Sequence, residues 1–204
     1  MDELELLKKD WQKDTVEYPK LTAKEIYPML LKKSSSIVKW IFIISVIELG
    51  IGVILAILNP SLEHSIEYPT WTNILIYGSY PVILFFVYQF YLNYKNISVT
   101  DDIKSLISNI LKTRRTVKHY VLFNIVLGGI IAAVGLFIGF TTNSGGLEQF
   151  NASASTKDYI ILIISIAIGT ILMIGIFLGI YYLLYGLLLR RLNRNYKELK
   201  KLEV

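Results

Sequence analysis

Residues Tyr159 to Leu189 read YIILIISIAIGTILMIGIFLGIYYLLYGLLL, a run of 31 residues without a charge. A helix needs only about 20 apolar residues to cross the hydrocarbon core of a bilayer, so this run can span it. Small residues recur near one face of the predicted helix, which lets a neighbouring backbone approach closely in lipid. They are Ser165, Gly169, Gly175, Gly179 and Gly186. The stretch therefore predicts an integral membrane protein built of packed helices.

The rest of the 204-residue chain follows the same pattern. Hydrophobic residues make up 53% of it, and they gather in long blocks rather than at the regular intervals of a soluble core. The chain has no cysteine, which excludes disulfides, thiolate metal sites and cysteine nucleophiles. We expect an all-α fold, an integral membrane four-helix bundle whose helices extend into the cytoplasm, with both termini inside.

Hydropathy divides the chain into spans and cytoplasmic segments. The predicted spans cover residues 37–58, 74–92, 120–140 and 159–189. We expect residues 1–36 to form a cytoplasmic amphipathic helical segment, residues 99–119 a cytoplasmic helix and residues 190–204 a basic tail, with 37–204 as the membrane bundle. The third span has its own small-residue stripe: Asn124, Gly128, Ala132, Gly135 and Gly139. Residues 141–158 are rich in Gly, Ser, Thr and Asn, which predicts a flexible outer loop.

Two capping signals predict where the cytoplasmic helices begin. Thr22 and Glu25 form a T-x-x-E capping box, so a helix should start near Ala23. Residues 98–102 offer hydroxyls and acids for a second start. Nothing breaks the pattern before the third span, so we expect one helix of roughly 60 Å over residues 101–140. The extended helices should pack together through Ile26, Leu30, Ile103, Ile107 and Ile110.

The basic residues predict the orientation. Of 21 Lys and Arg, eight lie before the first span or, as Lys39, at its start, six lie between spans two and three, and six lie in the C-terminal tail, which leaves only Lys157 for the other loops. By the positive-inside rule, both termini and the central loop are cytoplasmic. We therefore predict a multi-pass protein of the cell inner (cytoplasmic) membrane. The charge is a topology signal with attraction to anionic headgroups as a side effect, so no nucleic-acid partner is expected.

Glu48 is the one acidic residue within a predicted span, and it lies near the middle of residues 37–58. A carboxyl at that depth should face the bundle interior and is a candidate functional residue. By depth, its expected hydrogen-bond partners are Thr170 and the hydroxyl of Tyr80. A structural role, in which the protonated acid fixes the register of neighbouring helices, and a role in handling protons, ions or ligands both stay open.

The N-terminal residues are the candidate partner-binding site. Leu4, Leu7 and Trp11 fall on one face of a predicted helix, which would pack on its own bundle or dock on a partner protein or the headgroup layer. The two histidines, His64 and His119, fall on opposite sides of the membrane in the predicted topology, which favours neither a metal nor a haem site. We predict no catalytic residues, no cofactor and no metal site.

The segments MDELELLKKDW (1–11), LTAKEIY (21–27) and KKSSSIVKWIFIIS (32–45) resemble a family of small uncharacterised bacterial inner-membrane proteins. Some members carry the name beta-carotene 15,15'-monooxygenase, and some are said to lie beside sigma-factor genes. The name implies an iron enzyme that holds its metal with four histidines, and this chain has two. We therefore expect a protein that is not an enzyme.

Two classes of function are left. The first is a membrane-anchored interaction or regulatory protein, in the manner of an anti-sigma factor, that acts on a cytoplasmic protein partner through its cytoplasmic helices. The second is a small transporter or channel subunit that uses Glu48. Homo-oligomerisation stays open in both.

The predicted topology can be tested with single cysteines, since the chain has none of its own. Cysteines at positions 65 and 144, both serines, should react with a membrane-impermeant maleimide in intact cells, and one in place of Ser105 should react only after lysis. The reverse labelling pattern would disprove the N-in, C-in orientation.

Overall fold

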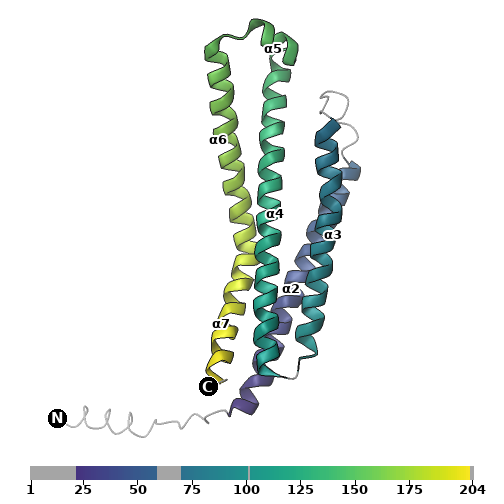
Figure 1. Ribbon diagram of the computed structural model, residues 1–204, viewed down its shortest axis with the longest axis vertical. Coiled ribbons are helices and arrows are strands. Elements are labelled where there is room, and N and C mark those ends of the chain that lie inside the picture. The colour runs from purple at the N-terminus through teal and green to yellow at the C-terminus, as the bar shows by residue number, and fades with distance from the viewer. Residues whose placement is uncertain (1–21, 59–69, 101, 203–204) are drawn as a thin grey trace, which may run out of the picture.

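The computed structural model describes residues 22–58, 70–100 and 102–202, and all of its regular elements are helical. The first three helices are α2 (Ala23–Leu58), α3 (Thr70–Ser98) and α4 (Ile103–Asn143). After the short helix α5 (Leu147–Ser153), the last helix runs without a break through α6 (Thr156–Tyr181), a π-helical turn η1 (Tyr182–Gly186) and α7 (Leu187–Leu202). Figure 1 shows these helices as a long bundle.

Four helices are long and apolar enough to cross a membrane: α2, α3, α4 and the continuous α6–α7 helix. Large apolar side chains cover their outward faces; for example, Ile57 of α2 and Ile171 of α6 are 69% and 68% exposed. Water would penalise such a surface, whereas hydrocarbon does not. The four predicted spans each lie within one of these helices. By helix length and composition, the chain is a multi-pass membrane protein.

Both predicted helix starts are confirmed. The backbone N–H and the hydroxyl of Thr22 donate to the Glu25 carboxylate, at 2.8 and 2.9 Å, where α2 begins. Asp102 is the N-cap of α4, and its carboxylate accepts a hydrogen bond of 3.2 Å from the N–H of Ser105. As expected, α4 then continues unbroken for 41 residues. At 1.5 Å per residue, its length is about 60 Å.

The helices pack differently at the two ends of the bundle. α4 lies along α6, α2 lies along α3, and α3 also contacts α4. α7 packs on α2 and α4, so the two helix pairs join at the end where α7 lies. Towards α5, the α4–α6 pair extends past the end of α3 (Figure 1). The bundle is therefore closed at one end and more open at the other.

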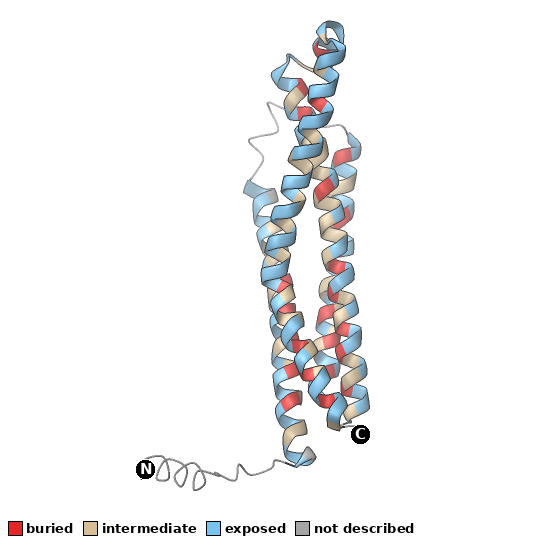
Figure 2. Ribbon diagram, turned by 90° about the vertical axis from the view of Figure 1, so that its left-hand side faces the viewer, coloured by how far each residue is buried: buried red, intermediate tan, exposed pale blue. Residues whose placement is uncertain are grey.

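The best-packed part of the protein is this closed end, which we call the basal bundle (residues 23–41, 90–120 and 185–202). Figure 2 shows buried residues gathering there, while the upper helices are mostly exposed. Every long helix contributes to one apolar core. Its fully buried members are Leu30, Val38, Ile97, Leu106, Ile110, Leu192 and Leu199. The predicted contacts are confirmed, since Leu30 and Ile110 belong to this core and Ile26, Ile103 and Ile107 pack against it.

The predicted outer loop at residues 141–158 contains a folded element, contrary to the expectation. α5 places the buried ring of Phe150 between the rings of Phe140 and Tyr159, with centroids 5.9 and 5.3 Å away. The hydroxyl of Tyr159 also donates to Asn151, at 3.1 Å. The Gly and Ser content suggested flexibility, but the aromatic contacts stabilise the short helix.

The small-residue stripes are only partly packing surfaces. A Cβ atom at Gly128 would lie 2.9 Å from the ring of Phe177, and one at Gly169 would lie 2.6 Å from Leu136, so α4 and α6 approach closely there. Around Gly135, Gly139, Gly175 and Gly179, nothing lies within 4 Å of such an atom. The stripes therefore mark the correct helices, but not every small residue in them faces a neighbour.

Two predictions concern residues that the structure does not describe. The predicted amphipathic helix with Leu4, Leu7 and Trp11 lies outside the described residues, as does the first outer loop with His64.

A matched pair of glycine-to-alanine substitutions in α4 tests the contact between α4 and α6. Gly128→Ala should destabilise the protein by about 1 kcal/mol or more, because its methyl group would overlap Phe177. Gly135→Ala should be neutral or stabilising, since its site is open and alanine favours the helix by about 0.5–1 kcal/mol. Thermal unfolding in detergent measures both variants. Equal effects would mean that α4 and α6 do not pack closely at Gly128.

Candidate functional site

Glu48 of α2 is hydrogen-bonded to two tyrosines of the last helix. The hydroxyl of Tyr181 donates to one carboxylate oxygen in a short hydrogen bond, and the hydroxyl of Tyr185 donates to the other at 3.0 Å. The two tyrosines are four residues apart, so their side chains lie one turn apart on the same face of a helix. The carboxyl thus links α2 to the junction of α6 and α7.

The helix widens at this point. Tyr181 is the residue before η1, and the N–H of Leu187 donates to the carbonyl of Tyr182, five residues earlier. Single π-helical turns of this kind occur frequently at functional sites. Here, the wide turn carries Tyr185, whose ring is 1% exposed. The local helix geometry and the carboxyl contact are therefore found in the same few residues.

Aromatic rings from α3 and α4 pack against the two tyrosines. The ring of Tyr120 on α4 lies 5.7 Å from that of Tyr185 and 6.4 Å from that of Tyr181. Phe90 on α3 lies 5.3 Å from Tyr120 and 6.5 Å from Tyr185. Such pairs each contribute about 0.5–1.5 kcal/mol beyond their buried area. The carboxyl and this cluster join α2, α3, α4 and the last helix at one level.

The predicted partners of Glu48 are wrong. The structure gives its hydrogen bonds to Tyr181 and Tyr185, not to Thr170 or Tyr80. The Thr170 hydroxyl is buried without a partner, and it precedes Tyr181 by eleven residues, about 16 Å along the helix. The depth argument assumed that the spans lie level with one another. The spacing of four residues between Tyr181 and Tyr185 was the signal in the sequence for a shared acceptor.

A second feature of the basal bundle is a groove between α2 and α7. It encloses about 860 Å³. Its lining residues are Met29, Lys32, Lys33, Ser36, Ile37, Arg191, Arg194 and Asn195. They include four cationic side chains and no acid. Sequence analysis missed this groove, because the positive-inside rule accounts for the same basic residues without bringing them together.

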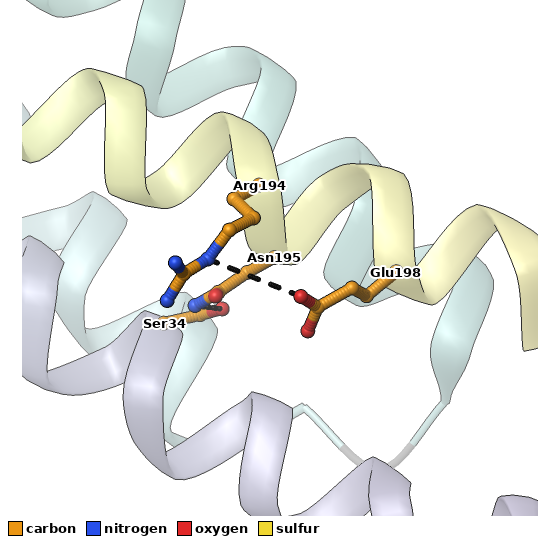
Figure 3. Close-up of polar contacts among 4 residues, drawn as sticks. All are labelled: Ser34, Arg194, Asn195 and Glu198. Atoms are coloured by element: carbon orange, nitrogen blue, oxygen red, sulfur yellow. Dashed lines mark hydrogen bonds and ion pairs between the residues drawn. The ribbon is translucent and has the colours of Figure 1, made fainter.

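A buried hydrogen bond holds the two walls of this basic groove together. The side-chain amide of Asn195 on α7 donates to the hydroxyl of Ser34 on α2 at 3.2 Å, and the two residues are 3% and 0% exposed. Figure 3 shows this contact beside Arg194, whose Nε is joined to the Glu198 carboxylate by a dashed line. The Arg194–Glu198 distance is 3.9 Å, and both side chains are exposed, so this ion pair is weak.

The remaining candidate residues do not join either feature. His119 is exposed on α4. Among the described residues, no group of three His, Cys, Asp or Glu could hold a metal ion. The arrangement thus offers two kinds of chemistry: a carboxyl bonded to phenols within the spans, and a concentration of positive charge at the basal end.

Substitution at Glu48 tests its structural role. Glu48→Gln should be nearly neutral for stability, because an amide can accept from one tyrosine and donate to the other. Glu48→Leu should cost about 0.6–2 kcal/mol, the range for hydrogen bonds between membrane helices. The double variant Tyr181→Phe/Tyr185→Phe should lose a similar amount of unfolding free energy. Adding Glu48→Leu to this variant should lower its stability little further, because the three residues share the same hydrogen bonds.

Tyr182→Phe is the matched control, since that residue is 52% exposed. Unfolding free energies in detergent measure all of these variants. Fully additive losses would show that the carboxyl and the phenols do not stabilise the fold together.

Comparison with known proteins places the chain in a family. The family model described as a domain of unknown function, DUF8845, matches residues 24–204. No curated protein and no solved structure matches the chain. The matched range runs from the start of α2 to the end of the sequence and so includes the Glu48 cluster and the basic groove. The chain belongs to the DUF8845 family.

Proposed function

We propose that this protein is a membrane-anchored interaction or regulatory protein that acts through the helices of its basal bundle, on the cytoplasmic side of the bacterial inner membrane. The observation that supports this most is the distribution of packing. The spans expose apolar side chains as lipid anchors do, whereas all four long helices share one buried core at the basal end. A well-packed end that projects from the membrane suits the binding of another macromolecule.

Polar contacts make the basal bundle rigid. The amide of Asn93 on α3 donates to the hydroxyl of Thr116 on α4 at 3.3 Å, in addition to the Asn195–Ser34 bond. The hydroxyl of Tyr27 donates to the carbonyl of Thr100 at 3.1 Å, which attaches α2 to the connection between α3 and α4. A surface with few mobile parts loses little conformational entropy on binding.

The N-terminal residues provide the partner-binding element in this proposal. Leu4, Leu7 and Trp11 form the apolar face of a predicted helix that precedes α2 in the sequence. An amphipathic helix can bind a partner by placing such a face in a groove. The charged and polar exterior of the basal bundle would then supply the rim of the contact.

A small transporter or channel subunit is the second candidate, and the Glu48 cluster is the observation that favours it. A carboxyl bonded to two phenols within the spans could exchange a proton with them. Both carboxylate oxygens are already bonded, however, which fits a fixed link between helices better than an open site. We do not propose a carotenoid-cleaving oxygenase, because the chain has two histidines rather than four.

Deletion of residues 2–20 distinguishes the candidates. We expect the truncated protein to insert and fold, since α2 has its own cap and apolar span, and to lose a partner that the intact chain captures from native membranes by crosslinking. Leu4→Ala, Leu7→Ala and Trp11→Ala together should have the same effect. Asp2→Ala, Lys9→Ala and Lys13→Ala form the matched control, as those residues lie on the opposite face of the predicted helix.

The transporter reading makes the opposite prediction. If the truncated protein keeps every phenotype and Glu48→Gln abolishes proton- or solute-dependent flux in liposomes, the interaction proposal is wrong.

A further inference from the structure

Two hollows follow one another along the seam between α2 and the last helix. The first is the basic groove. The second is an apolar furrow of about 230 Å³ on the side of the spans. Its lining residues are Trp40, Ile44, Leu183, Leu184, Leu187, Leu188 and Arg191. Arg191 lines both hollows, so positive charge and apolar surface meet at this residue.

The two hollows lie on the same side of the seam. On α2, Met29, Lys33, Ser36, Trp40 and Ile44 succeed one another at intervals of three or four residues, which places them on one helix face. α2 runs from the basal end towards α3, and the last helix returns in the opposite direction. Lys33 therefore lies near the level of Arg194, and Trp40 near that of Leu187 and Leu188. The groove thus continues into the furrow along the bundle axis.

Among the described residues, acids do not neutralise the charge of the groove. In the part of the chain that the structure describes, the only ion pair is Arg194–Glu198, and its distance is 3.9 Å. Lys32, Lys33 and Arg191 are exposed and have no acid among the groove-lining residues. Cations held together at the end of an apolar span attract anions from the adjacent membrane surface.

We propose that this seam binds an anionic phospholipid from the leaflet at the basal end. The phosphate lies in the basic groove against Lys32, Lys33 and Arg191, and one acyl chain lies in the furrow against Trp40 and Leu188. This occupant fits because it combines a negative headgroup with a hydrocarbon chain, as the adjoining groove and furrow require. Free phosphate would leave the furrow unfilled, and an acidic peptide would not extend into the spans.

The π-helical turn contributes to this site. Leu183 and Leu184 belong to η1 and line the furrow, while Tyr185 of the same turn bonds to Glu48. The Glu48 and Ser34 hydrogen bonds hold α2 against the last helix above and below the furrow. The lipid site is therefore formed by fixed helices. It is also independent of any protein partner.

Trp40 provides a direct test. The full-length protein with Trp11→Phe and Trp71→Phe retains Trp40 as its sole tryptophan and is reconstituted in phosphatidylcholine vesicles. Brominated phosphatidylglycerol should quench Trp40 more than brominated phosphatidylcholine at the same mole fraction. The relative binding constant for phosphatidylglycerol should fall by about fivefold for each cation replaced in Lys33→Gln and Arg191→Gln.

The control variant carries Lys112→Gln and Arg115→Gln, two exposed basic residues of α4 that do not line the groove. It should keep the full preference. Equal quenching by the two lipids, or an equal loss in the control variant, would overturn the proposal, since either result means general attraction to the surface. Loss of the preference in excess inorganic phosphate at constant ionic strength would assign the groove to a free anion and would also overturn it.

Discussion

A carboxyl group among membrane spans must find its hydrogen-bond partners within the protein, because hydrocarbon offers none. Glu48 meets this requirement with Tyr181 and Tyr185, and much of the structure depends on that link. A second link, Ser34 to Asn195, joins the same two helices nearer the basal end. The two bonds are separated by 14 residues on α2 and by 10 to 14 on the last helix. Because the two bonds are separated by nearly the same number of residues on both helices, they can form together between antiparallel helices. Together they set the register of α2 against the last helix.

The register explains why the two ends of the bundle differ. Near the Glu48 link and below it, α7 lies against α2 and α4, and apolar side chains from every long helix interlock. Above it, α4 and α6 form one pair and α2 and α3 the other. In lipid, helices gain little from burying apolar surface and associate where backbones approach closely or polar groups bond. Between α4 and α6, the side chains of Phe177 and Leu136 pack directly on Gly128 and Gly169, so the two helices lie close together there. The basal end, which we propose projects from the membrane, can also use the hydrophobic effect, and it has the larger core.

The basic residues have two consequences that follow from the same physics. By the positive-inside rule, we expect the Lys and Arg residues to stay on the cytoplasmic side during insertion and so to orient the spans. Once the helices are assembled, Lys32, Lys33, Arg191 and Arg194 line one groove at the end of the apolar seam. Repulsion among these four cations lowers the stability of the folded protein, and a bound anion would reduce that repulsion. The proposed lipid site does not use the proposed partner-binding residues, since Leu4, Leu7 and Trp11 precede α2 in the sequence.

Hydropathy and capping chemistry in the sequence alone determined the all-α class, the four membrane helices, the caps at Thr22 and Asp102 and the unbroken length of α4, because these properties depend on neighbours along the chain. The apolar contacts of the basal bundle also followed from helical periodicity. Only the tertiary structure decided the partners of Glu48, the order in the outer loop around Phe150, which glycines touch a neighbour and where the basic groove lies. Each of these depends on the axial offset and rotation of one helix against another, and a membrane helix is equally apolar at every depth. The composition of such a helix therefore predicts that it crosses the bilayer, but it does not predict which residues of the neighbouring helix it contacts.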